Sequence, residues 1–181
     1  VVESEPEPEP EPEQPKDEKQ IAEETFNLLN ANQNSFTQQW GTFQHRNTQI
    51  KTFMRWTNYH LQKRGIEIQD LTTSLADGVN LINLAEILSG VDLEVKWNPK
   101  PTNMPAKLQN INAAINHFKD HGIFIPPTPS HDIVSARIGP ILELIWAVIC
   151  GYDIAKAHFD RLRGHDALLL WAAFNAQDYN V

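Results

Sequence analysis

The chain has 181 residues, a net charge of −8 and one cysteine, Cys150. That length allows one domain with a sizeable core plus extensions, and a lone cysteine excludes an internal disulfide framework. The acidic start has no basic region followed by an apolar one, so it does not read as a signal peptide. The longest apolar run, 141–150, would cover about 15 Å as a helix, so we expect no membrane span.

The negative charge is confined to one end of the chain. Residues 1–35 hold ten acidic and two basic side chains, which gives −8, whereas residues 36–181 hold thirteen of each. The part of the chain that should fold is therefore neutral. With a neutral folded part and one short basic helix, we expect no nucleic-acid partner.

Residues 1–39 are predicted to be an acidic Pro/Glu-rich tail followed by a weak helix. Residues 5–13 alternate glutamate with proline, which favours an extended, solvated and disordered segment. Either this tail is a spacer, or it masks a basic face electrostatically. Within 16–34, Ile21, Ala22, Phe26 and Leu29 recur at helical spacing.

The next predicted elements are helices. Residues 48–63 and 106–120 are amphipathic, whereas 77–89 and 138–149 are apolar nearly all round, which is typical of central helices. Gly65, Gly90 and Gly122 should end the first three of these helices. The inward residues of the amphipathic helices are Ile50, Phe53, Thr57, Leu61, Leu108, Ile111, Ile115 and Phe118, and the outward ones are Lys51, Arg55, Asn58, Gln62, Gln109, Asn112, Asn116 and Lys119.

A short helix should follow 124–128, with Thr128 as its N-cap and Pro129 at its first position. No stretch alternates convincingly with the period of a strand. The sequence therefore predicts an all-α fold, a compact domain of four main helices plus short ones. We expect Phe53, Trp56, Leu81 and Trp146 in its core, and Trp97 either as a lid on the core or as a surface anchor.

Four motifs in order resemble the type 1 calponin homology domain of the tandem actin-binding family that includes spectrin, α-actinin, filamin and cortexillin. Residues 49–61 carry Q-x-x-T-F-x-x-W-x-N-x-x-L, and residues 70–90 carry D-L-x-x-x-L-x-D-G-x-x-L-x-x-L-x-E-x-L-S-G. Residues 107–118 and 144–149 resemble K-x-x-N-x-x-x-A-hydrophobic-x-x-F and L-I-W-x-x-I. Residues 40–155 are then the first calponin homology domain.

The resemblance also accounts for the end of the chain. Residues 156–165 would be the connector, and 166–181, with L-L-L-W, would be the first helix of a truncated second calponin homology domain. The alternative is a local helix that folds back on this chain. In relatives the second domain packs on the first and restrains binding, so a chain without most of that domain should bind without having to open.

The chain departs from the family pattern in two places. The family's tryptophan before the first helix would fall at His45, whereas the nearest one here is Trp40. Where the family has I-V-D-G-N-x-K-L, residues 133–141 read IVSARIGPI, with Ser135, Ala136, Arg137 and Gly139 in place of Asp, Gly, Asn and Lys.

The resemblance implies F-actin as partner, in the cytoplasm at the actin cytoskeleton. Filamentous actin is acidic, and residues 46–66 hold five basic residues and no acid, although this stretch could also be an ordinary solvated face. The flank with Trp40 and Phe43 would either order on actin or staple the first helix to its own domain. The implied actin-binding residues are Gln49, Lys51, Thr52, Met54, Arg55 and Tyr59 in a first segment, and Asn112, Asn116, Lys119, His121 and Ile123 in a second.

The alternative function is an adaptor that binds a non-actin partner, such as microtubules or a signalling protein. Enzyme activity, a cofactor and a metal site are not expected. His117 and His121 have i, i+4 spacing, but Phe118 stands where a zinc protease has Glu, and no third ligand is evident. Cys150 lies in an apolar helix and should be unreactive.

Overall fold

The computed structural model describes residues 17, 19–28, 31, 42–156, 158–159, 162–163 and 165–169. Its described part is helical, as predicted, apart from an antiparallel pair of two-residue strands. The elements are α2 (Thr42–Leu61), η1 (Gln62–Arg64), α3 (Leu71–Leu75), α4 (Val79–Ser89), α5 (Met104–Asp120), α6 (Ser130–Val134), α7 (Ile138–Ile149), η2 (Cys150–Ile154), β1 (His158–Phe159) and β2 (Leu162–Arg163).

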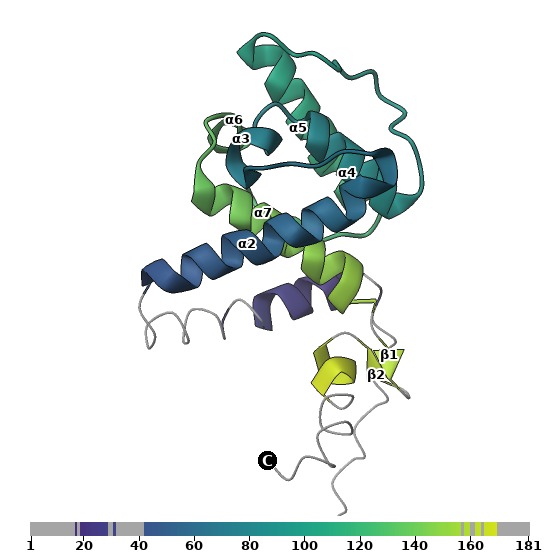
Figure 1. Cartoon of the computed structure of the whole chain (residues 1–181). Coiled ribbons are helices and arrows are strands. Elements are labelled where there is room, and N and C mark those ends of the chain that lie inside the picture. Colours follow the sequence, from purple (N-terminus) through teal and green to yellow (C-terminus); the bar gives the residue numbers. More distant parts are fainter. Residues whose placement is uncertain are drawn as a thin grey trace, which may run out of the picture.

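Helix α4 lies between α2 and α5 and packs against both, while α7 packs against α2, α3 and α6 (Figure 1). These are the two helices whose apolar circumference predicted a central position. Each has side chains buried all round, because neighbouring helices cover it on more than one side. Fully buried members of this core include Leu81, Ile82, Leu84, Ile141, Leu144 and Ile145.

Several helix limits differ from those predicted. Helix α2 starts at Thr42, six residues before the expected start. The predicted helix 77–89 starts only at Val79, because Gly78 has a left-handed backbone (φ 79°) that separates α3 from α4. Helix α5 starts at Met104, because the Asn103 side chain caps it by accepting a hydrogen bond from the amide of Ala106 (2.9 Å).

The predicted cap of α6 is wrong. The helix spans Ser130–Val134, and Pro129 precedes it as an N-cap without a side-chain hydrogen bond. Thr128 instead donates its hydroxyl proton to the carbonyl of Pro126 (3.1 Å). The hydroxyl is therefore used within the loop and is not available to the helix amides.

The turn between α3 and α4 rests directly on α5. A Cβ atom added at Gly78 would lie 2.6 Å from the Cβ of Asn110 and 2.7 Å from the backbone nitrogen of Ile111. The buried amide of Asn110 donates to the carbonyls of Asp77 (3.2 Å) and Asn98 (2.8 Å), and its oxygen accepts from the amide of Asn98 (2.9 Å). One side chain thus joins the α3–α4 turn, the loop before α5 and α5 itself.

Two other polar motif residues also tie loops to helices. Asn58, expected to face outward, instead exchanges two hydrogen bonds with the backbone of Ile68 (2.8 and 2.9 Å), so that prediction is wrong. Buried Glu86 accepts from Arg64 (2.5 Å) and from the amide of Leu93 (2.9 Å). Both side chains satisfy backbone groups of segments that have no regular structure of their own.

The tryptophans border the core. Trp56 and Trp146 are half-buried against it, whereas Phe53 is buried and stacks on Trp146, with ring centroids 5.9 Å apart. The indole nitrogen of Trp56 donates to the carboxylate of Asp153 (2.6 Å), which joins α2 to η2. Trp97 is half-buried against the same core, which supports the lid interpretation.

Residues 19–28 form the weak helix that the sequence indicated (purple, below α2 in Figure 1). Ala22 and Phe26 are buried, and the Phe26 ring lies 5.7 Å from that of Phe124. The predicted Leu29, the tail before residue 17, Trp40 and Trp171 lie outside the described residues, as does the side chain of Phe43. Of the predicted second-domain helix, 166–169 lies within a described helix at 165–169.

The departure from the family pattern at 133–141 leaves a strained backbone. Ala136 has a φ of 54°, the one non-glycine residue with positive φ in the described part of the chain. It stands where the resemblance places glycine. An alanine Cβ in this left-handed conformation costs roughly 1–2 kcal/mol relative to the right-handed one.

Gly78→Ala should destabilise the fold by about 2–5 kcal/mol, because left-handed strain adds to overpacking against α5. The matched control is Gly90→Ala, which has a similar φ of 74° but no atom within 4 Å of the added Cβ. Gly90→Ala should therefore show only the strain, about 1–2 kcal/mol. Urea unfolding measures both. Equal losses would show that the approach to Asn110 is unimportant.

Ala136→Gly should stabilise the fold by about 1 kcal/mol, because relief of the left-handed strain outweighs the extra freedom of glycine in the unfolded chain. Ala113→Gly, in the middle of α5, should instead cost about 1 kcal/mol. The two urea midpoints should move in opposite directions. A lower midpoint for Ala136→Gly would contradict the assigned strain.

Candidate interaction surface

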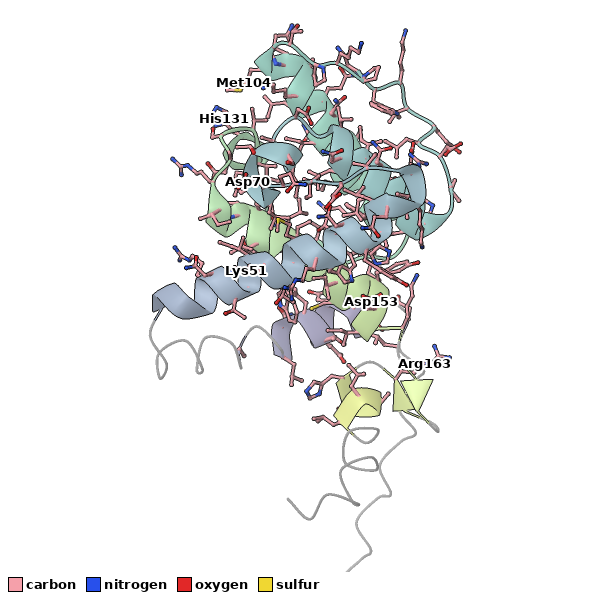
Figure 2. All side chains as sticks on the ribbon, in the orientation of Figure 1. Lys51, Asp70, Met104, His131, Asp153 and Arg163 are labelled. Carbon is pink, nitrogen blue, oxygen red and sulfur yellow. The ribbon has the colours of Figure 1, made fainter. Side chains whose placement is uncertain are left out.

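Four of the predicted actin-binding residues form one exposed face of α2: Lys51, Thr52, Arg55 and Tyr59. They recur at i, i+1, i+4 and i+8, so they lie on the same side of a helix with 3.6 residues per turn. Tyr59 is 69% exposed and is the largest apolar surface among them. Lys51 lies near the middle of the helix (Figure 2). We call these four residues the α2 face.

The α2 face is positively charged and carries no acid. Lys51 and Arg55 are like charges four residues apart, a pairing that slightly destabilises an isolated helix. Within the described part of the chain neither forms an ion pair. Arg64 contributes nothing to this face, because it pairs with Glu86 (2.5 Å) and Asp92 (3.5 Å).

The other two predicted residues of α2 lie off this face. Met54 is half-buried and packs against the core, and Gln49 is also half-buried. Both belong to the side of the helix that turns toward the domain. Met54 therefore has a structural role that is sufficient to explain an apolar residue at this position.

The second predicted segment divides in the structure. Asn112, Asn116 and Lys119 form an exposed row along α5, and His121 is exposed just beyond it. Asn112 already accepts a hydrogen bond from the Ser130 hydroxyl (2.5 Å). Because α4 lies between α2 and α5, the two predicted segments do not form one cluster of side chains.

Ile123 does not belong to an exposed surface. Its side chain is 4% exposed, and a Cβ added at Gly151 would lie 2.8 Å from its Cγ2. The prediction that Ile123 contacts actin is wrong for this conformation. An apolar residue directly after a helix-ending glycine is usually one that packs back onto its own helix, and that signal was present in the sequence.

A groove of about 370 Å³ lies beside the exposed row of α5. Its walls are the segment 91–95 and one side of α5, from Ala113 to His121. We call this the α5 groove. The sequence alone does not indicate this groove. One wall alternates apolar and acidic residues as a strand would, but its backbone bends at Val91, Glu94 and Val95.

Two histidines line the α5 groove. Burial, followed by the neighbouring His121, lowers the pKa of His117, which favours its neutral form. The ring nitrogen Nε2 of His117 lies 2.8 Å from the Ser89 hydroxyl, and Nδ1 of His121 lies 2.8 Å from the carbonyl of His117. The described residues contain no group of three side chains that could hold a metal ion.

Cys150 is fully buried, and burial raises the pKa of its thiol to about 12. A thiol that stays protonated is a poor nucleophile and a poor metal ligand, which agrees with the expectation that Cys150 is unreactive. Among the described residues, no helix combines the length and apolar character needed to cross a bilayer.

Comparison with known proteins identifies relatives of this architecture. Over 133 residues the chain is 31% identical to alpha-actinin A of Dictyostelium discoideum, covering 74% of this chain and 15% of that protein. It is 39% identical to filamin-A of Drosophila melanogaster over 117 residues, which cover 65% of this chain and 5% of that protein. It is 34% identical to the erythrocytic spectrin beta chain of Mus musculus over 140 residues, which cover 72% of this chain and 6% of that protein.

The chain therefore spans a small fraction of the length of these relatives. The family model of the calponin homology (CH) domain matches residues 47–152. That match runs from the first turns of α2 into η2 and includes the helices that form the core. The chain belongs to the calponin homology domain family.

Proposed function

We propose that this chain is a non-enzymatic F-actin-binding module of an actin cytoskeleton protein, and that it binds through the α2 face. The observation that carries the proposal is the pair Lys51 and Arg55, exposed, four residues apart and without an acidic partner in the described structure. Two unpaired like charges on one helix slightly oppose folding, and they suit an acidic partner.

The α2 face combines the two features that a docking helix needs. Its charges steer association with an acidic filament and set its dependence on salt. Tyr59, 69% exposed, offers an aromatic surface that can be buried at the centre of an interface. In this proposal Lys119 and Asn112 of α5 add a second contact, whereas Asn116 and His121 belong to the α5 groove.

We also propose that residues 166–181 begin a second calponin homology domain that restrains the α2 face when it is complete. The support is the L-L-L-W motif and the described helix at 165–169. Leu168 and Leu169 are exposed there, as expected for residues that another domain would cover. The proposed location is the cytoplasm, at actin filaments.

The competing function is that of an adaptor for microtubules or a signalling protein. Both functions could use the same basic helix, so the face alone does not distinguish them. Sedimentation with F-actin and, separately, with microtubules does. Pelleting with actin filaments at low salt is expected, and pelleting with microtubules alone would favour the adaptor.

Reversing the charges of the α2 face should abolish binding to actin filaments. Lys51→Glu with Arg55→Glu should reduce the pelleted fraction to background, because two attractions become repulsions. The matched control is Lys96→Glu with Lys100→Glu, two exposed lysines before α5, which makes the same change in net charge. Helical circular dichroism should be unchanged in both. Equal losses in the two variants would indicate a non-specific charge effect.

Binding of the unmodified chain should weaken steeply as salt increases. The Debye length falls from about 10 Å at 0.1 M to about 3 Å at 1 M salt, which screens exposed charges such as those of the α2 face. Co-sedimentation isotherms between 50 and 300 mM KCl measure the change in Kd. An affinity that stays constant over this range would contradict an electrostatic α2 face.

A further inference from the structure

The α5 groove is formed because the segment between α4 and α5 is fixed at its ends and not in its middle. At the first end, the Ser89 hydroxyl accepts from the amide of Val91 (3.1 Å) and Glu86 accepts from that of Leu93 (2.9 Å). At the other end, Gln109 donates to the carbonyl of Lys96 (3.3 Å). The small side chain of Ala113 lies among the residues that line the space beside this segment.

Between these attachment points the backbone is free to pair. In the described structure the amides and carbonyls of Glu94 and Val95 form no hydrogen bond. Val91 and Val95 are 49% and 57% exposed. The backbone bends at Val91, Glu94 and Val95, so these free amides and carbonyls are single hydrogen-bonding groups beside exposed apolar side chains and not the edge of a strand.

The charge of the groove selects the kind of peptide. Asp92, Glu94 and Asp120 line it, and all three are exposed. Arg64 is 3.5 Å from Asp92, but it is also paired with buried Glu86. The nearby cations Lys96 and Lys119 do not line the groove. Apart from Asn116 and the two histidines, the lining is therefore acidic and apolar, and its carboxylates are opposite in sign to the α2 face.

We propose that the α5 groove is a docking site for a short peptide in which lysine or arginine alternates with apolar residues. Its backbone would hydrogen-bond to the free amides and carbonyls at the bend of Glu94 and Val95. It would place its cations against Asp92, Glu94 and Asp120, and its apolar residues on Val91, Val95 and Ala113. The volume of about 370 Å³ lies in the range typical of ligand sites, about 300–1,000 Å³. This proposal does not depend on binding to actin, because it uses a separate surface of opposite charge.

The test uses the full 181-residue chain and two capped pentapeptides, Leu-Lys-Val-Arg-Leu and Leu-Glu-Val-Glu-Leu. NMR titration of amide shifts should show saturable binding of the basic peptide, with shifts concentrated at 91–95 and along α5 from Ala113 to Asp120. The acidic peptide should bind at least about tenfold more weakly. Equal binding of the two peptides, or shifts located elsewhere, would overturn the proposal.

Charge reversal then tests the groove itself. Glu94→Lys with Asp120→Lys should weaken binding of the basic peptide by about tenfold and should improve binding of the acidic one. The control Glu67→Lys with Glu143→Lys makes the same change in net charge at exposed positions outside the groove. Like the unmodified chain, the control should bind the basic peptide more tightly than the acidic one. The assignment would be refuted if the groove variant still bound the basic peptide more tightly, or if the control came to bind the acidic peptide more tightly as well. If the groove variant fails to fold, the comparison of the two peptides on the unmodified chain decides.

Discussion

The buried amide of Asn110 is the contact on which the arrangement of the helices depends. It satisfies backbone groups of Asp77 and Asn98, and it lies directly beneath Gly78, where there is no room for a side chain. A buried amide of this kind stabilises only if its partners are all in place, and losing one leaves an unpaired polar group inside. The α3–α4 turn, the loop 91–103 and α5 are therefore fixed together or not at all.

Most of the polar residues that make the family recognisable have structural roles of this type. Asn58 holds the backbone of Ile68, Glu86 holds Leu93, and Trp56 is bonded to Asp153. None of these side chains belongs to the α2 face. The family motifs therefore indicate how the chain folds. The α2 face consists mainly of residues at positions where the motifs allow any amino acid. This is why the fold follows from the sequence more securely than the site.

The positions of α4 and α7 could be predicted because their apolar residues leave no polar side, which forces them inward. The exposed row of Lys51 and Arg55 could be predicted from helical periodicity. The buried position of Ile123 could have been inferred from the glycine before it, whereas the inward turn of Asn58 could not, because it depends on the loop that brings Ile68 against it. The start of α4 was misplaced for a similar reason. The left-handed backbone of Gly78 and its close approach to Asn110 are tertiary features that a linear pattern does not show. The α5 groove depends on how two segments are spaced, and a linear pattern carries no such information.

The helix at 19–28 extends the folded unit beyond the region that the family model matches. Phe26 is 4% exposed and lies against Phe124, almost one hundred residues later in the chain. A fragment limited to residues 47–152 would leave Phe124 without this cover, and an uncovered aromatic ring beside the end of α5 favours self-association. The boundary set by family similarity is therefore not the boundary of the cooperative unit, and the first residue of a fragment chosen for study would affect its solubility as much as its binding.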